Sequence, residues 1–350
     1  MSETTAIVIF LASLGLSVIS SLVLVGNIDK IGAGLGLSEG LLGIITALGA
    51  DTPEIAAAVT ALLSGKHDIG LGVVFGSNIY NIAALLGLSA LVAGSVRISR
   101  GPLLFNGVVG LLVTLLAVSL VLGWLGPAPV TLLLGVVLVP YVALYAVTPQ
   151  LIRRLPGAHL IQGLVSEPGT AGQEGDNHSS EGSADHEGTA VASNEGDGTP
   201  ARKASLMDGL SAVPVLVSIV VASIGMVNSA VVLGGKWGVP DHILGILVLA
   251  TLTGIPNVLA GVRLALRGRG SAVVSETLNS NSLNVLSGVA LPALVMGLGA
   301  PSGQTVFAAW WLLGMTIVAV ALAAFRGGVS RVEGAILIAL YLVFVGLVIF

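Results

Sequence analysis

The chain has no cysteine and few charged residues, and these two absences limit what kind of protein it is. Without cysteine, neither a disulfide nor a thiolate metal site is available. Asp, Glu, Lys and Arg make up only 9% of the 350 residues, whereas 55% are hydrophobic. A soluble protein cannot bury that much apolar surface, and the repeated apolar runs of about 20 residues are long enough to cross a bilayer. The composition predicts a polytopic helical membrane protein.

Glycine, proline and charged residues divide the apolar sequence into ten expected transmembrane helices. They cover residues 4–26, 37–63, 69–93, 102–124, 128–148, 208–234, 241–266, 271–296, 302–324 and 331–350. No basic segment precedes the first run, which is also too long for a signal peptide, so we expect it to remain as a span. The predicted fold class is all-α.

The basic residues support this number of spans. If the N-terminus lies outside, only Lys66 and Lys236 fall in outside loops, and the other twelve of the fourteen Lys and Arg fall inside. The inside residues are Lys30, Arg97, Arg100, Arg153, Arg154, Arg202, Lys203, Arg263, Arg267, Arg269, Arg326 and Arg331. One missed or extra span would scramble this division. The positive-inside rule therefore predicts ten helices with both termini outside.

A polar segment separates two sets of five helices. Residues 167–197 contain eight Asp or Glu and no Lys or Arg, with Gly, Ser, Thr and Asn filling most of the rest. Such a sequence cannot bury a core. We expect residues 151–205 to form an acidic, disordered cytosolic linker between a first five-helix repeat, 1–150, and a second, 206–350. A cation-binding regulatory role is the alternative, but the acids lack the spacing of a calcium loop.

Two motifs recur in the two halves at one offset. "ALGADTPE" begins at Ala47 and "ATLTGIPN" at Ala250, while "SNIYN" begins at Ser77 and "SNSLN" at Ser280. Both pairs are 203 residues apart. This offset aligns Pro53 with Pro256, Glu54 with Asn257, Asn78 with Asn281, Asn81 with Asn284, and Gly65 with Gly268. It also aligns Ser38 with Asp241, and each of these two residues is expected to be the N-cap of its helix. Because the second half starts on the other side of the membrane, the halves are predicted to be inverted repeats.

The repeated motifs bring polar groups to the middle of four spans. Asp51 and Glu54 lie mid-span in 37–63, and Asn81 mid-span in 69–93. In the second half, Thr253 and Asn257 lie mid-span in 241–266, and Asn284 mid-span in 271–296. A proline in each of the spans 37–63 and 241–266 frees backbone carbonyls at the same depth. A carboxylate near the bilayer centre costs about 3 kcal/mol on insertion scales, so a functional role is the default for Glu54. Interrupted helices at matching places predict a midplane transport site.

"GADTPE", followed 27 positions later by "GSNIYN", resembles the first alpha repeat of the calcium/cation antiporter superfamily, which includes the sodium/calcium exchangers. That repeat has glycine, small hydroxyl residues, proline and glutamate, then Gly-Ser-Asn-Ile, an apolar residue and Asn. The resemblance covers both halves without the linker, and the second repeat, "LTGIPN" with "NSNSLN", is degenerate. It implies an alternating-access antiporter in which the first helical pair moves against the other eight helices.

The resemblance also implies a set of ion ligands. By position these are Glu54, Ser77, Asn81, Thr253, Asn257, Ser280 and Asn284, with carbonyls near Ala47, Ala50 and Ala250. Three positions depart from the family pattern. Asn257 stands where the second repeat normally has an acid, Asn284 where many members have aspartate, and Asp51 where a small hydroxyl residue is usual. We therefore include Asp51 in the site, and the expected negative charge lies entirely on the second helix.

The leading expectation is a sodium/calcium exchanger, with transported Ca²⁺ and Na⁺ and no cofactor. Asp51 and Glu54, three residues apart on one helix face, together can neutralise one Ca²⁺. Two close carboxylates in a medium of low dielectric also tend to share a proton, so proton-coupled or sodium-selective antiport is the alternative. A further alternative is a sensor or scaffold without transport. An intramembrane aspartyl protease needs a second deep aspartate, and we expect no enzymatic activity.

Two further expectations concern Glu276 and the surroundings of the protein. Glu276, near the cytosolic end of span 271–296, is interpreted as an acid paired with Arg267 or Arg269, or alternatively as part of an ion path. The expected partners are inorganic cations and the lipid bilayer, without nucleic acid. The small loops and the absence of a targeting segment favour a prokaryotic inner membrane.

Overall fold

The computed structural model describes residues 1–35, 39–146 and 206–350. Its elements are α1 (Glu3–Leu35), α2 (Glu39–Leu63), α3 (His67–Asn81), η1 (Ile82–Leu88), α4 (Ser89–Ala93), β1 (Ser95–Arg97), α5 (Arg100–Val121), α6 (Pro127–Ala146), α9 (Leu206–Trp237), α10 (Asp241–Ile243), η2 (Leu244–Leu249), α11 (Ala250–Thr253), α12 (Ile255–Leu266), α13 (Gly270–Asn284), η3 (Val285–Ala290), α14 (Leu291–Met296), α15 (Gly303–Arg326), β2 (Gly328–Ser330) and α16 (Arg331–Ile349). The expected linker, 151–205, and the expected N-cap Ser38 lie outside the described residues.

The described helices group into ten segments that match the ten expected spans to within a few residues at most ends. Helices dominate because every backbone N–H and C=O in a bilayer must be bonded within the protein. Seven of these segments are long and apolar enough to span a membrane, and the bent pair Asp241–Thr253 and Ile255–Leu266 makes an eighth. The other two segments, α2 and α13–η3–α14, carry the motifs "ALGADTPE" and "SNSLN". The prediction of a polytopic helical membrane protein is confirmed, with one small addition, the antiparallel pairing of β1 with β2.

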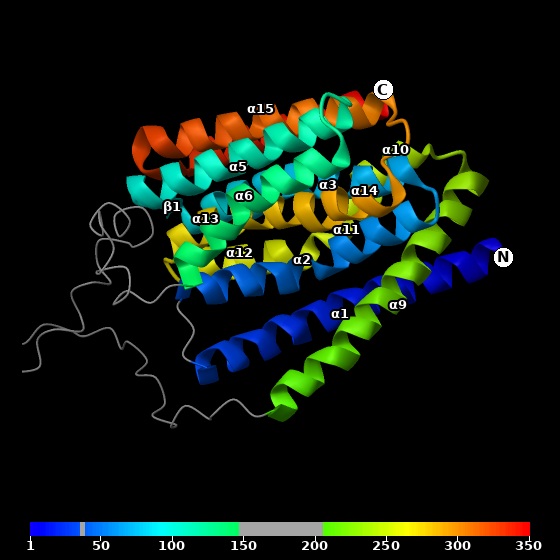
Figure 1. Ribbon diagram of the computed structural model, residues 1–350, viewed down its shortest axis with the longest axis horizontal. Helices are drawn as coiled ribbons and strands as arrows, with labels where there is room; N and C mark the ends of the chain where they lie inside the picture. The colour runs from blue at the N-terminus through cyan, green and yellow to red at the C-terminus, as the bar shows by residue number, and fades with distance from the viewer. Residues whose placement is uncertain (36–38, 147–205) are drawn as a thin grey trace, which may run out of the picture.

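The offset of 203 residues relates the two halves throughout. Helices α3 and α13 begin at His67 and Gly270, end at Asn81 and Asn284, and both continue into a π-helical turn. Helices α2 and α12 end in the same way, at Gly65 and Gly268, where both glycines have φ 72°. This left-handed conformation closes a Schellman turn and favours glycine at both sites. Figure 1 shows α1 running away from the N-terminal end of the bundle and α9 running back, as inverted halves require.

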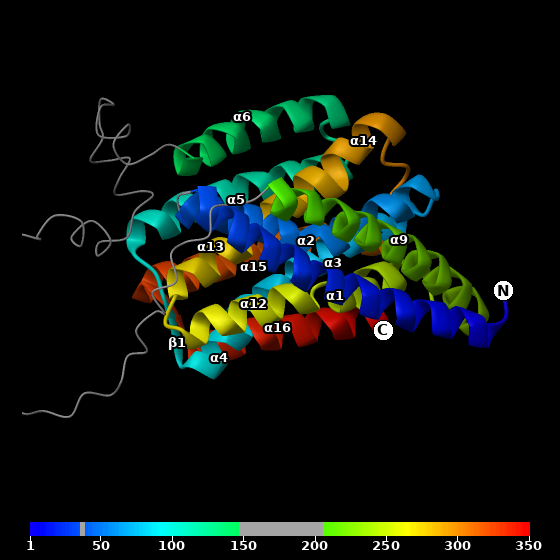
Figure 2. The same cartoon turned by 90° about the horizontal axis from the view of Figure 1, so that it is seen from below.

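The helices differ in how deeply they are buried. In the most apolar window of the α3–α4 span, 94% of residues are buried, against 28% for α1, α6 and α16. Helix α3 is therefore central, and the exposed apolar faces of α1, α6 and α16 are suited to contact lipid. Helices α1 and α9 pack on each other along one flank of the bundle (Figures 1 and 2). Both chain termini lie at the same end of the bundle, as an even number of spans requires (Figure 1).

Two local expectations about the helix ends and breaks are wrong. Pro240, not Asp241, occupies the N-cap of α10, and Asp241 instead pairs with Lys66 at 3.2 Å. Proline was expected to interrupt both polar helices, but α2 continues as an α-helix through Pro53. In the second half the helix does break, with a bend of 44° at Gly254, between α11 and α12.

Candidate functional site

Six of the expected site residues form one hydrogen-bonded cluster at the centre of the bundle. Its two carboxylates, Asp51 and Glu54, come from α2 and are fully buried. The neutral members are Asn81 from α3, Asn257 from α12, and Ser280 and Asn284 from α13, each at most 1% exposed. The structure thus brings groups from four helices, two in each half, to one place without contact to solvent.

Asn257 joins the two carboxylates. Its Nδ2 donates to Asp51 Oδ1 at 2.7 Å and to Glu54 Oε2 at 3.1 Å. Since one nitrogen serves both acceptors, the two carboxylates are close neighbours. Ser280 Oγ adds a bond to Asp51 Oδ1 at 2.6 Å, and Asn284 Nδ2 a longer one to Glu54 Oε2 at 3.4 Å. All these partners are neutral, so the bonds orient the carboxylates without balancing their charge.

Several oxygens of the cluster have no hydrogen-bond partner among the residues that the structure describes. They are Asp51 Oδ2, Asn81 Oδ1, Asn257 Oδ1 and Asn284 Oδ1. Buried polar atoms are normally paired, and each exception calls for an explanation such as an ion. All four are oxygens, and hard cations are bound by carboxylate and amide oxygens. The described chain holds no group of three or more His, Asp or Glu that suits a metal, so a cation here would depend on these amides.

Ser77 and Thr253 lie at the same level but bond to their own helices. Ser77 Oγ donates to Val74 O at 3.1 Å, and Thr253 Oγ1 to Leu249 O at 2.8 Å. Comparison with the second repeat explains why Ser77 does not bond to a carboxylate. Its equivalent, Ser280, donates to Asp51, but the residue equivalent to Asp51 is Gly254, which has no side chain. The hydroxyl oxygens of Ser77 and Thr253 can still accept a hydrogen bond or bind a cation, since each hydroxyl uses only its proton in the bond to its own helix.

Gly254 cannot be replaced by an acid without rearrangement. A Cβ at this position would lie 2.9 Å from Cδ1 of Tyr80 and 3.2 Å from the carbonyl oxygen of Ala250. The Tyr80 ring in turn packs on Tyr341, with centroids 5.6 Å apart. The space that Asp51 fills in the first half is therefore taken by an aromatic ring in the second, which explains why the second half has no counterpart of Asp51.

The backbone near the expected carbonyl ligands is buried. Ala47, Ala50 and Ala250 are each at most 1% exposed. In the first half the hydroxyl of Ser21, on α1, lies 3.4 Å from the carbonyls of Gly49 and of Ala50. In the second half the Ala250 carbonyl accepts from Gly254 N at 3.2 Å. Helix α1 thus reaches backbone oxygens beside the site, a contact that the sequence motifs did not indicate.

Besides Ser21, the sequence motifs did not identify Asn78 as a residue of the site. It is fully buried, and its Oδ1 accepts from Asn284 Nδ2 at 3.2 Å. Its place in the repeated "SNxxN" motif was the available signal. Glu276 lies on α13, four residues before Ser280, and is partly buried.

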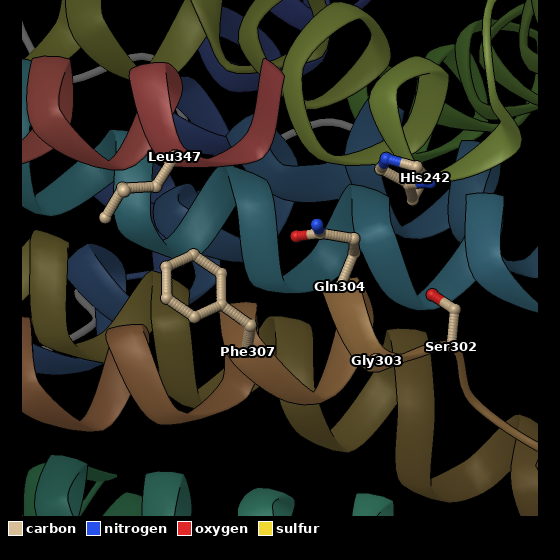
Figure 3. A pocket seen from close by; sticks show the side chains of 6 residues that line it. All are labelled: His242, Ser302, Gly303, Gln304, Phe307 and Leu347. Carbon is tan, nitrogen blue, oxygen red and sulfur yellow. The ribbon is translucent and has the colours of Figure 1, made fainter. Parts of the chain in front are cut away.

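Each side chain of the cluster is at most 1% exposed in the part of the chain that the structure describes. A cavity of about 530 Å³ lies elsewhere, between the start of α10, the start of α15 and the end of α16. Figure 3 shows its lining residues, His242, Ser302, Gly303, Gln304, Phe307 and Leu347. None of them belongs to the carboxylate cluster. The cavity therefore lies apart from the central site, whose side chains are buried in the described structure.

Inverted five-helix halves with an interrupted helix and buried carboxylates between them are the architecture of secondary transporters. Comparison with known families agrees. The model of the family described as sodium/calcium exchanger protein matches residues 5–149 and 211–350. The chain belongs to this family, and the predicted membership of the calcium/cation antiporter superfamily is confirmed.

Individual relatives match shorter parts of the chain. A protein named as an antiporter, CaxA of Alkalimonas amylolytica, is 40% identical over 84 residues, which are 24% of this chain and 26% of CaxA. Sodium/potassium/calcium exchanger 4 of Homo sapiens is 35% identical over 88 residues, 25% of this chain and 14% of that protein. The matched part thus spans about a quarter or less of these curated relatives.

Solved structures match over nearly the whole chain. The crystal structure of the H⁺/Ca²⁺ exchanger CAX has a TM-score of 0.70 and 15% identity, covering 99% of this chain and 82% of that one. The sodium-calcium exchanger NCX_Mj has a TM-score of 0.62 and 19% identity, covering 99% of both chains. These identities are low, so the two structures show the fold alone, and they agree with the predicted ten-helix plan.

Proposed function

We propose that this protein is a secondary active cation antiporter that moves Ca²⁺ by alternating access through the central cluster. The observation that carries the proposal is a set of four buried oxygens, one on Asp51 and three on the amides around the two carboxylates, that have no hydrogen-bond partner in the described part of the chain. Ca²⁺ takes six to eight oxygens with carboxylates to balance its charge. Two carboxylates, three amide oxygens and the hydroxyls of Ser77 and Thr253 can supply them.

Na⁺ is the first choice for the coupling ion. The same oxygens can hold monovalent cations when the divalent ion is absent, so the two would compete for one site. Family membership supports this choice, and calcium occurs in the printed names of the sodium/potassium/calcium, sodium-calcium and H⁺/Ca²⁺ exchangers that the chain resembles. In this mechanism the protein acts without a cofactor and without chemical change to its substrate.

Proton coupling is the second candidate, and one contact favours it. Asn257 Nδ2 donates to both carboxylates, which holds two acids together in a site without a cationic partner among their hydrogen-bonding neighbours. Like charges this close rarely both ionise in a buried site, so one proton shared by the two carboxyl groups would neutralise one of them and could be the ion that is exchanged.

The proposed arrangement in the membrane follows the distribution of basic residues. Residues 1–150 and 206–350 form the two inverted repeats, both termini face outward, and linker 151–205 faces the cytosol. The inner membrane of a prokaryotic cell is the proposed location, with inorganic cations and lipid as partners.

The test is reconstitution of the purified protein in lipid vesicles. Uptake of ⁴⁵Ca²⁺ is measured under an outward Na⁺ gradient, under a pH gradient, and with neither, and ²²Na⁺ uptake is measured in parallel. We expect Ca²⁺ uptake driven by the Na⁺ gradient. Uptake driven only by the pH gradient would select the proton-coupled alternative. Absence of gradient-driven flux of both ions would refute antiport and leave the sensor or scaffold function.

A further inference from the structure

A second buried polar cluster lies beside the central site, on the other face of α13. It comprises Asn106 of α5, Tyr141 and Tyr145 of α6, and Ser275 and Asn279 of α13. Asn106 is 1% exposed, Tyr141 4% and Asn279 7%. Burying hydroxyl and amide groups is unfavourable unless they bond to one another, and this group does so.

Tyr141 is the centre of this cluster. Its hydroxyl donates to Asn106 Oδ1 at 2.6 Å and also contacts Asn279 Oδ1 within hydrogen-bonding range. A phenol has one proton, so it donates to one of the two acceptors at a time. Asn106 Oδ1 has a second donor in Tyr145, at 3.1 Å. The Tyr141 proton can therefore go to Asn279 while Asn106 stays bonded.

Helix α13 is held by polar bonds on two faces. Asn279 faces Tyr141, and Ser275, one turn earlier, accepts from Asn106 Nδ2 at 3.0 Å. Ser280, which follows Asn279 in the chain, donates to Asp51 in the ion site at 2.6 Å. Consecutive helical residues are about 100° apart around the axis. A rotation of α13 that withdraws Ser280 from Asp51 must therefore also move Asn279 relative to Tyr141.

The other repeat does without this cluster. At the offset of 203 residues, Phe344 stands for Tyr141, Ala309 for Asn106, and Gly76 for Asn279. Phe344 is fully buried among aromatic rings, with Phe307 5.9 Å and Trp311 5.7 Å away between centroids. The fold thus accepts a phenyl ring at this position. A purely structural need for the hydroxyl would apply to both copies of the arrangement. Tyr141 contacts α13, the helix whose Ser280 bonds a carboxylate, whereas the equivalent serine in the other copy, Ser77, bonds its own helix.

We propose that Tyr141 is a positioning residue for the ion site, and that its hydroxyl, through Asn279, sets the rotation of α13 and hence the place of Ser280 against Asp51. The inference rests on the proposed function and deepens it, because it assigns part of the cation affinity to a residue that does not touch the ion. The hydroxyl acts by keeping the Ser280 bond to Asp51 Oδ1, which leaves Asp51 Oδ2 directed to the cation.

The role of Tyr141 is tested by measuring cation binding and cation transport separately. Binding is measured on detergent-purified protein as the rise of the unfolding temperature with added Ca²⁺ or Na⁺, since a ligand that binds only the folded state stabilises it. For Tyr141→Phe we expect the apparent Kd for Ca²⁺ to rise about three- to tenfold, the scale of one hydrogen bond. The unfolding temperature without cation should fall slightly, because the buried Asn279 Oδ1 loses this donor, whereas the maximal transport rate should stay near wild type. Tyr145→Phe removes the second donor to Asn106 but leaves the Tyr141 hydroxyl beside Asn279, so it is the matched comparison and should raise the Kd less than Tyr141→Phe does.

A double-mutant cycle with Ser280→Ala separates positioning from simple destabilisation. If Tyr141 acts through Ser280, then Tyr141→Phe adds no further loss of affinity in the Ser280→Ala background. Additive losses, equal effects of the two tyrosine variants, or an unchanged Kd in Tyr141→Phe would each overturn the inference. If no cation stabilises even the wild-type protein, the proposed function itself fails, and that outcome is distinct from the others.

Discussion

Asn78 and Asn281 bond to each other in a reciprocal pair at the centre of the bundle. Asn78 Nδ2 donates to the carbonyl oxygen of Asn281 at 3.1 Å, and Asn281 Nδ2 donates to that of Asn78 at 3.3 Å. The two residues are 203 positions apart, the offset of the repeat. The pseudo-two-fold axis that relates the halves therefore passes between α3 and α13, next to the ion site.

Removing either amide should destabilise the fold, but unequally. Asn78 Oδ1 also accepts from Asn284 Nδ2 at 3.2 Å, whereas Asn281 Oδ1 has no hydrogen-bond partner in the described structure. We expect Asn78→Ala to lower the free energy of unfolding by about 2–3 kcal/mol and Asn281→Ala by about 1–2 kcal/mol. Denaturant unfolding in detergent measures both. The reverse order would contradict the hydrogen-bond assignment.

Much of the architecture was predictable because it depends on patterns that the bilayer enforces. Apolar runs, basic loops and the shared offset predicted ten spans and two halves, and the helices at His67 and Gly270 start where the offset requires. The interruption at Pro53 was predicted wrongly. A proline removes one donor, and the helix continues because neighbours can compensate, Ser21 being close to the loosened carbonyls.

The site was less predictable than the fold. Position in the repeats predicted which residues meet, but not their pairing. That Asn257 serves both carboxylates depends on side-chain directions across two helices that are distant in the chain, which a sequence does not encode locally. The absence of a counterpart to Asp51 in the second half likewise follows from Tyr80, a bulky neighbour of Gly254 that is distant in the chain. Asn78 is part of the repeated motif, but the sequence did not predict the partners of its side-chain amide.

Glu54 should be essential for cation binding. Glu54→Gln removes one unit charge from a buried site, and a unit charge about 4 Å from a cation contributes about 4 kcal/mol at an effective dielectric of 20, so the Ca²⁺ affinity should fall at least about a thousandfold. Vesicle uptake of ⁴⁵Ca²⁺ should fall to background.

The control for Glu54→Gln is Glu333→Gln. Glu333 bonds the backbone N of Ser330 at 2.7 Å in a capping box at the start of α16, far along the chain from the central motifs. Glutamine can maintain that cap, so transport should persist. Full transport by Glu54→Gln would refute the assignment of the ion site.

Calcium binding should strengthen as pH rises. Asp51 and Glu54 must both be ionised to neutralise Ca²⁺, and their shared donor Asn257 keeps them close enough to share a proton in the cation-free site. Ca²⁺ then displaces a proton, and the affinity should rise by up to about tenfold per pH unit for each proton released. Calorimetric titration at a series of pH values measures this, and Asp51→Asn should flatten the dependence. A pH-independent Kd would exclude proton displacement.

The glycine contact between α3 and η2 should tolerate no added methyl group. A Cβ at Gly76 would lie 2.2 Å from the carbonyl oxygen of Ile246, so the two backbones would have to separate. We expect Gly76→Ala to destabilise the protein by about 1–3 kcal/mol, as overpacking does. Gly314→Ala on α15 is the control, because a Cβ there meets no atom within 4 Å. Equal unfolding temperatures for the two variants would contradict the close approach.

Asn257→Glu should shift the site toward stronger calcium binding and lower stability without the ion. The substitution places a carboxylate in the second repeat, opposite Glu54, and removes the amide that bridges Asp51 and Glu54. Three neighbouring carboxylates repel one another when the site is empty, so the unfolding temperature without cation should fall. Ca²⁺ supplies the missing positive charge, so the stabilisation by saturating Ca²⁺ should exceed that of wild type at alkaline pH. Asn257→Gln, which keeps an amide of the same length as the new acid, controls for size. An unchanged Ca²⁺ affinity in Asn257→Glu would count against Asn257 as a ligand, since a carboxylate that reaches the ion must alter its binding.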